Sequence, residues 1–369
     1  MYKDQTFNSV DEIAEHILSG NRRALAKGIS LIESSLEEDR DKTEDLLKMV
    51  LPFTGNSMRL GITGSPGVGK STFIEKFGLY CVQQNKKPAI LAIDPSSQSH
   101  GGSILGDKVR MPELSRNQSA FIRPSPSKGT LGGVGNSTRE AILLCEAAGF
   151  DIIIIETVGV GQSEVDVRSM TDLFLLLLLP TAGDEVQGIK RGIMELADII
   201  FINKADGSLL PLAEIAKSQI ASSLTLMTSP TEHWNVPVLI GSGLHGNGIS
   251  DLWNKCLDFF YTNAQLNEHI QSRRNHQHIE WFETVAEKEL MRIVENTTLW
   301  KSLKIDAMHE IIHSNNVPSF TAKNMIKEFI SVAQLDSTYK GSLRFLLSKL
   351  YICKNSKDTL LHIFSLLLT

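Results

Sequence analysis

Six short apolar runs, separated by helix-like stretches or polar loops, constrain the fold more than any other feature of this sequence. They are Arg59–Thr63, Ala89–Ile93, Ile152–Ile155, Leu173–Leu179, Ile199–Ile202 and Val236–Ile240. Their apolarity is continuous rather than alternating, which predicts strands buried on both faces, as in a parallel sheet covered by helices. We therefore predict an α/β doubly wound domain with a mostly parallel sheet flanked by helices over residues 56–262.

The segments on either side of this domain predict helices. Within residues 1–55, Ser9 and Glu12 have the spacing of a helix capping box ahead of an apolar face. After Tyr261 no strand-like run returns, and residues 265–295 form one long polar helix pattern with a sparse apolar stripe. We predict that residues 263–369 form an α-helical extension.

The members of that stripe are Ile279, Phe282, Val285 and Leu290. His269, His276 and His278 fall near Arg273 and Arg274 in the same pattern. We expect this polar face to be solvated, and we regard a metal site there as the less favoured alternative.

Composition and charge exclude several classes of protein. The chain has 369 residues, a formal net charge of -5 and scattered Lys and Arg, so we expect no nucleic-acid partner. The N-terminus matches neither a secretory signal nor a transit peptide, and the longest apolar run falls short of the roughly 18 residues of a membrane span. We expect a cytoplasmic protein with no membrane partner. Cys81, Cys145, Cys256 and Cys353 lie far apart, which favours reduced, buried thiols.

A phosphate-binding loop lies between the first apolar run and a helix-like stretch. It consists of Gly64, Ser65, Pro66, Gly67, Val68, Gly69, Lys70 and Ser71, followed by Thr72. This pattern, G-x-x-x-x-G-K-[ST], between a strand and a helix is typical of nucleoside triphosphatases. The glycines let backbone N–H groups surround phosphate oxygens, Lys70 would neutralise the β- and γ-phosphates, and Ser71 would bind Mg²⁺.

A second motif predicts which base is bound. Asn203, Lys204 and Asp206 form N-K-x-D directly after the run Ile199–Ile202. Guanine presents two adjacent donors, N1–H and the N2 amine, that one carboxylate can accept, whereas adenine lacks this pair. A site that hydrogen-bonds one specific edge of its ligand prefers that ligand over an analogue lacking the matching donors by about 10⁴-fold or more. We expect Ser242, Gly243 and Leu244, just past Val236–Ile240, to support the base through main-chain N–H groups.

Two carboxylates at predicted strand ends are candidate Mg²⁺ ligands. Asp94 follows one apolar run and Glu156 another, and ligands bind at the carboxyl edge of a parallel sheet. Helix capping is the alternative role.

Glu156 to Gly159 stands where small GTPases carry D-x-x-G, so the Gly159 N–H would sense the γ-phosphate. The next residue is Val160, which cannot orient the attacking water as Gln does. We therefore expect slow intrinsic hydrolysis, or help from Gln162 or a partner.

Together these residues resemble the MeaB/ArgK-type P-loop GTPases, the chaperones of adenosylcobalamin-dependent methylmalonyl-CoA mutase. The similarity covers about residues 8–330 and is strongest at Asp94–Ser97, Gly101–Asp107, Glu156–Glu164, Ala182–Lys190 and Gly192–Asp198. Val109 stands where the family usually has Thr, and Gly243 where Ala is common. Neither departure removes a predicted ligand.

The resemblance implies further roles and partners. Asp107 would join Ser71, Asp94 and Glu156 around Mg²⁺, and residues 182–190 would form a switch that couples nucleotide state to the mutase. The polar members of that switch are Asp184, Glu185, Gln187 and Lys190. The resemblance also implies a homodimer through the C-terminal helices. The mutase partner would be methylmalonyl-CoA mutase or a related acyl-CoA mutase.

Two other functions share parts of this pattern. A metallochaperone GTPase of the nickel-insertion type has the same nucleotide core, but such proteins usually carry His-rich tails or Cys pairs. A small-molecule kinase or transport ATPase conflicts with the guanine motif at Asn203–Asp206. We therefore favour a GTP-hydrolysing chaperone that gates adenosylcobalamin loading and protects the mutase.

Overall fold

The computed structural model describes residues 7, 9–34, 36–94, 111–126, 133–157, 163–181, 191–262, 264–314 and 316–335. The chain forms two compact units, Met1–Phe282 and Glu283–Thr369. The first unit contains the sheet and its covering helices, and the described residues of the second are helical apart from the connections.

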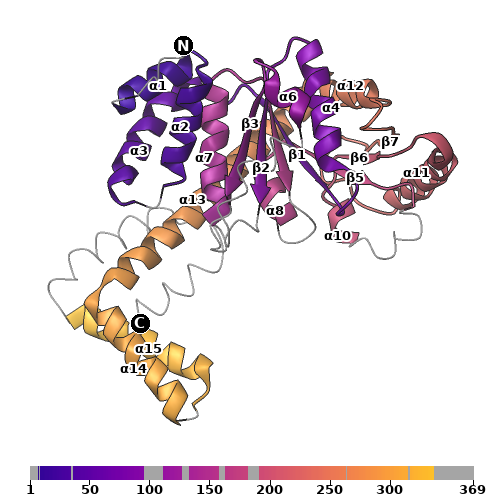
Figure 1. Ribbon diagram of the computed structural model, residues 1–369. Helices are drawn as coiled ribbons and strands as arrows, with labels where there is room; N and C mark the ends of the chain where they lie inside the picture. The colour runs from indigo at the N-terminus through magenta and orange to yellow at the C-terminus, as the bar shows by residue number, and fades with distance from the viewer. Residues whose placement is uncertain are drawn as a thin grey trace. The chain divides into compact units, whose positions relative to one another are not determined.

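The first unit is built on a seven-stranded parallel sheet in the order β3-β2-β4-β1-β5-β6-β7 (Figure 1). Its strands are β1 (Met58–Gly64), β2 (Pro88–Asp94), β3 (Phe121–Pro126), β4 (Ile152–Thr157), β5 (Leu173–Leu178), β6 (Ile199–Ile202) and β7 (Val238–Ile240). The predicted doubly wound α/β fold is confirmed, and each of the six apolar runs overlaps with one strand.

The strand β3 was not predicted from the sequence. It pairs only with β2 and therefore lies at the edge of the sheet. Its sequence is interrupted by Arg123, Pro124 and Pro126, so it lacks a continuous apolar run. Proline cannot donate a hydrogen bond to a neighbouring strand, which an edge strand tolerates and a central strand does not.

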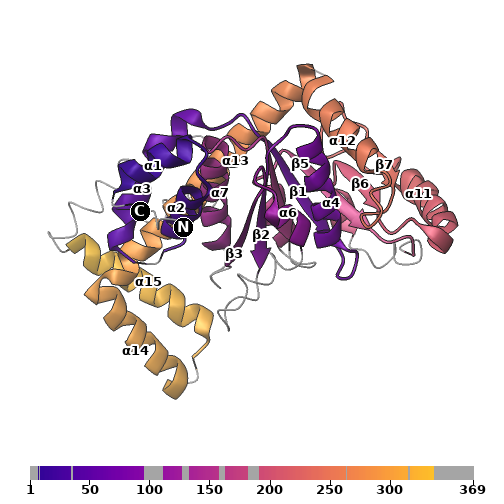
Figure 2. The ribbon, with the colours of Figure 1, turned by 45° about the horizontal axis from the view of Figure 1, so that its top comes forward.

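Helices cover one face of the sheet with aromatic and aliphatic side chains (Figure 2). These helices are α4 (Lys70–Gln83), α6 (Pro112–Arg116) and α12 (Ile249–Leu257). Phe73 and Phe77 of α4 are almost completely buried there, together with Ile152 and Ile154 of β4. Ile153 and Ile155 belong to the core on the other face. Both faces of β4 are therefore buried, as continuous apolarity predicts.

The opposite face is covered in two parts. Over β2, β3 and β4 lies α7 (Gly133–Ala147), and the N-terminal helices α1 (Val10–Leu18), α2 (Arg22–Ile32) and α3 (Glu38–Val50) pack against α7. Over β5 and β6 lie α10 (Arg191–Met194) and α11 (Leu210–Leu224). The predicted cap of the first helix is confirmed, because the Glu12 N–H donates to the Ser9 hydroxyl at 3.2 Å. A short 3-10 turn, η1 (Leu51–Phe53), leads from α3 towards β1.

The long helix α13 (Ala264–Asn296) buries part of its polar face, which we expected to be solvated. Arg274 and Gln277 are 7% and 6% exposed, whereas Ile279 and Phe282 of the predicted apolar stripe are 52% and 55% exposed. The prediction of a solvated polar face is therefore wrong for the arginines. Arg274 is buried because the Asp172 carboxylate, at the amino end of β5, accepts its hydrogen bonds. Arg273 forms an ion pair at 3.6 Å with the Asp198 carboxylate, at the amino end of β6.

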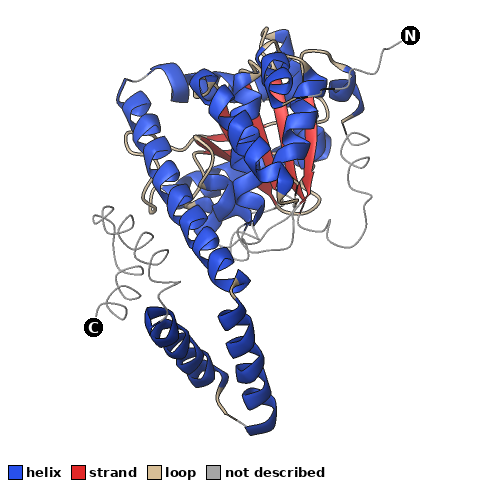
Figure 3. Cartoon of the chain, turned by 90° about the vertical axis from the view of Figure 1, so that its left-hand side faces the viewer, coloured by secondary structure: helices blue, strands red, loops and turns tan. Residues whose placement is uncertain are grey.

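The described part of the second unit contains the end of α13, α14 (Thr298–Ser314) and α15 (Pro318–Leu335). Figure 3 shows α13 as one continuous helix, followed by these two. α14 and α15 contact each other, and the rings of Trp300 and Phe329 meet edge to face at 5.3 Å. This part of the chain agrees with the predicted α-helical extension. Residues 336–369 lie outside the described residues.

The described cysteines agree with the sequence prediction. Cys81, Cys145 and Cys256 are buried free thiols, and burial raises the pKa of each, that of Cys256 to about 12. Such thiols stay protonated and unreactive at neutral pH. Cys353 lies outside the described residues. Across the described ranges, no helix has both the length and the apolar character needed to cross a bilayer.

Candidate nucleotide-binding site

The predicted phosphate-binding loop connects the carboxyl end of β1 with the first turn of α4. Gly67 and Gly69 have φ values of 81° and 91°, a region that side chains with a Cβ rarely adopt. A Cβ on Gly64 would lie 2.6 Å from the Leu177 carbonyl oxygen of β5, so this position also requires glycine. Val68 is completely buried and anchors the middle of the loop. The local sequence therefore determines an open turn at a helix N-terminus, where anions bind.

The Lys70 ammonium group lies against the loop itself. Its Nζ donates to the carbonyl oxygens of Gly64 at 2.7 Å and Ser65 at 3.5 Å. Partial burial lowers the pKa of Lys70, while the negative charges of Glu156 and Glu164 raise it. The positive charge is therefore held beside the glycine turn, where the sequence predicts the phosphates.

Ser71 and Glu156 come together at the carboxyl edge of the sheet. The Ser71 hydroxyl donates to Glu156 Oε1 at 3.3 Å, and Glu156 is only 5% exposed. Beside them, the hydroxyls of Thr63 and Thr157 are hydrogen-bonded at 3.0 Å across β1 and β4. These pairs meet because β1 and β4 are neighbouring parallel strands that end at the same edge.

The remaining predicted metal ligands are only partly described. Asp94 is the last residue of β2, which pairs with β4 through Ile93 and Thr157. It therefore ends on the strand next to Glu156, but its side chain lies outside the described part of the structure. Asp107 and the γ-phosphate sensor Gly159 are also outside the described residues, as are Val160 and Gln162.

Asn203 connects three segments of the site. It is 3% exposed, and its Nδ2 donates to the Val68 carbonyl oxygen of the phosphate loop at 2.8 Å. Its Oδ1 accepts from the Gly243 N–H, also at 2.8 Å. Lys204, at a positive φ of 60°, adds a hydrogen bond from Nζ to the Gly67 carbonyl oxygen at 2.8 Å. Both residues therefore hold the phosphate loop, a role that the N-K-x-D pattern alone does not predict.

Asp206 is oriented by the segment after β7. The Ser242 hydroxyl donates to Asp206 Oδ2 at 2.5 Å and accepts from the His245 N–H at 3.2 Å. Ser242 is completely buried, whereas the Leu244 side chain is 64% exposed. We expected only main-chain groups of residues 242–244 to act at this site. The structure adds the Ser242 side chain, which fixes the carboxylate.

Gly243 lies closely against α4. A Cβ added there would lie 2.9 Å from Cα and 3.1 Å from Cβ of Phe73, and 3.3 Å from Asn203 Oδ1. We expect Gly243→Ala to lower the free energy of unfolding by about 1–3 kcal/mol, because the crowded atoms include helix backbone. Guanine-nucleotide binding should be retained, because Ala is common at this position in the family that the chain resembles.

Chemical denaturation and nucleotide titration of this variant test both expectations. Gly192→Ala is the matched control, because no atom lies within 4 Å of a Cβ at that position. If Gly243→Ala unfolds at the same denaturant concentration as the control, the close contact with Phe73 does not constrain this site.

The predicted switch residues cannot be placed. Asp184, Glu185, Gln187 and Lys190 all belong to the segment 182–190, which lies outside the described residues. The helix α10 begins directly after this segment, at Arg191.

Comparisons with known proteins agree with this arrangement. Residues 25–298 match the sequence model of the family described as "Methylmalonyl Co-A mutase-associated GTPase MeaB". The GTPase ArgK of Escherichia coli is 40% identical over 329 residues, which cover 88% of this chain and 98% of ArgK. The mitochondrial methylmalonic aciduria type A homolog of Mus musculus is 43% identical over 299 residues, covering 78% of this chain and 71% of the mouse protein.

A solved structure supports the same relationship. The crystal structure titled LAO/AO transport system kinase superposes with a TM-score of 0.69 at 34% identity, covering 89% of this chain and all of the other. The sequence match extends over most of the chain. The fold also agrees with this family, as do the phosphate loop and the N-K-x-D motif. The chain therefore belongs to the MeaB/ArgK family of P-loop GTPases, which are hydrolases of GTP.

Proposed function

We propose that this GTPase is a chaperone that gates adenosylcobalamin loading and protects methylmalonyl-CoA mutase or a related acyl-CoA mutase. The observation that supports a guanine-nucleotide switch best is the hydrogen-bonded connection between its two motifs. Asn203 and Lys204 of the base motif contact Val68 and Gly67 of the phosphate loop. A nucleotide bound across both motifs would further restrict the movement of two loops that are already hydrogen-bonded to each other. The family description, which names the mutase, supports the choice of partner.

In the proposed complex, backbone N–H groups of residues 64–72 surround the phosphates, and Lys70 neutralises their charge. The Asp206 carboxylate accepts from N1–H and N2 of guanine, with Ser242, Gly243 and Leu244 behind the base. Because the Ser242 hydroxyl already orients Asp206, the carboxylate would lose little conformational freedom on binding.

The residues present fit a magnesium ion. Ser71 and Glu156 place a hydroxyl and a buried carboxylate 3.3 Å apart beside the phosphate loop, and Mg²⁺ prefers such oxygen ligands. Ser71, Asp94, Asp107 and Glu156 would hold the ion, directly or through water. The ion would offset the negative charge of the β- and γ-phosphates during hydrolysis.

We propose that intrinsic hydrolysis is slow. Val160 follows Gly159 where a water-orienting Gln stands in small GTPases, and an aliphatic side chain cannot hydrogen-bond a water. Gln162 or a residue of the mutase would then orient the attacking water. In this scheme the Gly159 N–H senses the γ-phosphate. The switch segment then transmits nucleotide state to the mutase through Asp184, Glu185, Gln187 and Lys190.

The assembly is also part of this proposal. We place the domains at residues 1–55, 56–262 and 263–369, with a cytoplasmic homodimer formed through the C-terminal helices. Several large apolar side chains of α14 and α15 are exposed, among them Ile305, Ile312 and Phe320 at 67%, 72% and 63%. Apolar surface of this kind is typical of an interface between subunits.

GTP turnover with and without purified methylmalonyl-CoA mutase tests the proposed function. We expect the mutase to raise kcat by about tenfold or more, because a partner group can supply what Val160 lacks. Parallel reactions should contain ATP, which we expect to be neither bound nor hydrolysed, and related acyl-CoA mutases. If no cobalamin-dependent mutase binds the protein or changes its turnover, the chaperone function is wrong.

A further inference from the structure

The helix α8 (Ser163–Arg168) follows the carboxyl end of β4 after only residues 158–162. The residues that precede it include Glu156, beside Ser71, and the proposed γ-phosphate sensor. In GTPases such segments change position when the γ-phosphate is lost. The far end of α8 is held by groups from three other elements, which determine how it can move.

The first of these groups is Asp198, the residue before β6. Arg168 Nη1 donates to Asp198 Oδ2 at 2.8 Å, and Nη2 donates to Oδ1 at 3.2 Å. Asp198 is completely buried and also accepts from the Phe174 N–H at 2.9 Å. A bidentate, buried pair of this kind has a well-defined geometry. The end of α8 is thereby attached to the strand that leads to Asn203.

The second group is Gln277 of α13. Its Nε2 donates to the carbonyl oxygens of Thr171 at 2.9 Å and Arg168 at 3.3 Å, in the turn after α8. Arg139 of α7 bridges the same two parts, because Nη1 donates to the Gln277 carbonyl oxygen at 2.9 Å and Nη2 to the Ser169 hydroxyl at 2.7 Å. The side chain of Gln277 is therefore inserted where α7, α8 and α13 meet.

Around this junction, α13 is attached to the sheet through buried charges. Arg274 donates to both oxygens of Asp172, at 2.7 Å from Nε and 2.6 Å from Nη2, and to the Ser57 carbonyl oxygen at 2.7 Å. Arg273 donates to the Asp172 carbonyl oxygen and the Thr231 hydroxyl. Asp172 and Asp198 precede β5 and β6, so the attachment is at the edge of the sheet opposite the nucleotide loops.

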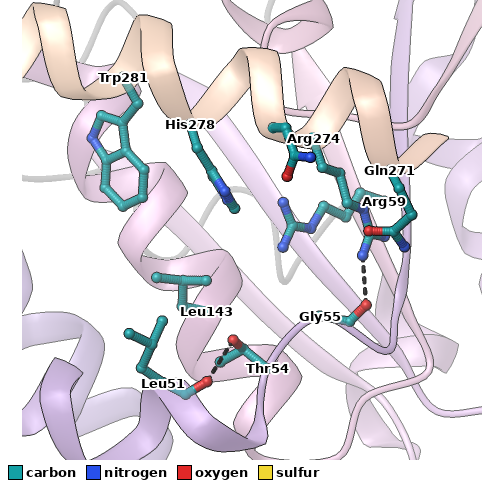
Figure 4. Close-up of a pocket in the computed structure, with 10 residues that line it drawn as sticks. Leu51, Thr54, Gly55, Arg59, Leu143, Gln271, Arg274, His278 and Trp281 are labelled. Carbon is teal, nitrogen blue, oxygen red and sulfur yellow. Dashed lines mark hydrogen bonds between the residues drawn. The ribbon is translucent and has the colours of Figure 1, made fainter. Parts of the chain in front are cut away.

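One side of α13 is not tightly packed. A cavity of about 370 Å³ lies between α13 and two other parts of the chain, the η1–β1 segment and α7. Figure 4 shows His278 and Trp281 pointing from α13 across this cavity towards Leu143 and Leu51. A close-packed interior resists displacement, whereas a cavity gives the helix room for a second position.

We infer that nucleotide state is coupled to α13 through α8, with Gln277 as the positioning residue at their junction. This inference rests on the proposed function, because it requires the segment after Glu156 to respond to the γ-phosphate. When that segment moves, α8 moves with it, and its Arg168–Thr171 end carries the contacts to Asp198 and Gln277. Coupling between two sites is reciprocal, so weakening the α13 contact must change the relative affinities for GTP and GDP.

Gln277→Ala in the full-length chain tests this coupling, with Ser272→Ala as the control, because Ser272 is exposed on the same helix and does not line the cavity. The measurement is the ratio of the dissociation constants for GDP and a non-hydrolysable GTP analogue, with kcat and KM for GTP alongside. We expect Gln277→Ala to change this ratio by between about twofold and about thirtyfold, the usual range for residues on a coupling route. Ser272→Ala should leave the ratio unchanged.

Ser169→Ala provides a milder variant in case Gln277→Ala does not fold. It removes the hydroxyl that accepts from Arg139 and should shift the ratio in the same direction. In the wild type, amide hydrogen exchange over residues 264–282 should differ between GDP and the GTP analogue. If the ratios of the folded variants equal that of Ser272→Ala, the coupling through α8 is overturned. Failure of the wild type to prefer GTP over ATP would instead overturn the proposed function.

Discussion

Asp206→Asn is expected to lower the affinity for GTP by about 100-fold or more and to shift preference towards xanthine nucleotides. The amide that replaces the carboxylate can accept only one of the two guanine hydrogen bonds, and it leaves a donor facing the N2 amine. Xanthine carries an oxygen at this position, so the new amide can donate to it. Competition of GTP, XTP and ATP for the bound nucleotide measures all three affinities.

The structure explains why this variant should still fold. The Ser242 hydroxyl, which donates to Asp206 Oδ2, can hydrogen-bond either atom of an amide. Asp11→Asn, on the exposed first turn of α1, is the matched control for the loss of one negative charge. Unchanged GTP affinity in Asp206→Asn would show that this carboxylate does not recognise the base.

Lys70→Ala is expected to remove most of the affinity for the triphosphate and to lower kcat by about 10²–10³-fold or more. The ammonium group lies against the glycine turn, where it donates to the Gly64 carbonyl oxygen at 2.7 Å. Removing one positioned charge that stabilises developing negative charge has effects of this size. Single-turnover hydrolysis and equilibrium titration separate the loss of rate from the loss of affinity.

A second lysine of the same helix provides the comparison. Lys76→Ala removes a positive charge from α4 outside the phosphate loop, so it should leave turnover near the wild-type value. Retained hydrolysis in Lys70→Ala, at saturating GTP, would exclude the lysine from the catalytic step. Its role would then be limited to the structure of the loop.

The predicted strands and most of the proposed site depend on local sequence. The glycines at 67 and 69 adopt positive φ because their own neighbours require a tight turn, and Asp206 follows a strand that its apolar run predicts. The carboxyl ends of all strands lie at the same edge of a parallel sheet, so the proximity of Ser71 and Glu156 could also be anticipated. The edge strand β3 could not be predicted from the sequence, because prolines break the pattern that identifies a buried strand.

The contacts within the site required the fold. Asn203 and Val68 are 135 positions apart, and no local pattern indicates that the asparagine amide supports the phosphate loop. The same holds for Ser242, whose hydroxyl reaches Asp206 across 36 positions. Both contacts arise because β1, β6 and β7 end at the same edge of the sheet.

The sequence by itself determined six of the seven strands, the phosphate loop and the preference for guanine, because each is specified by residues that are neighbours in the chain. Only the tertiary structure decided which face of α13 is buried. A polar helix pattern predicts solvent exposure unless carboxylates of other segments accept its hydrogen bonds. Asp172, about a hundred positions before Arg274, provides that partner at the amino end of β5. Pairing between distant charges depends on chain topology, which no local periodicity encodes.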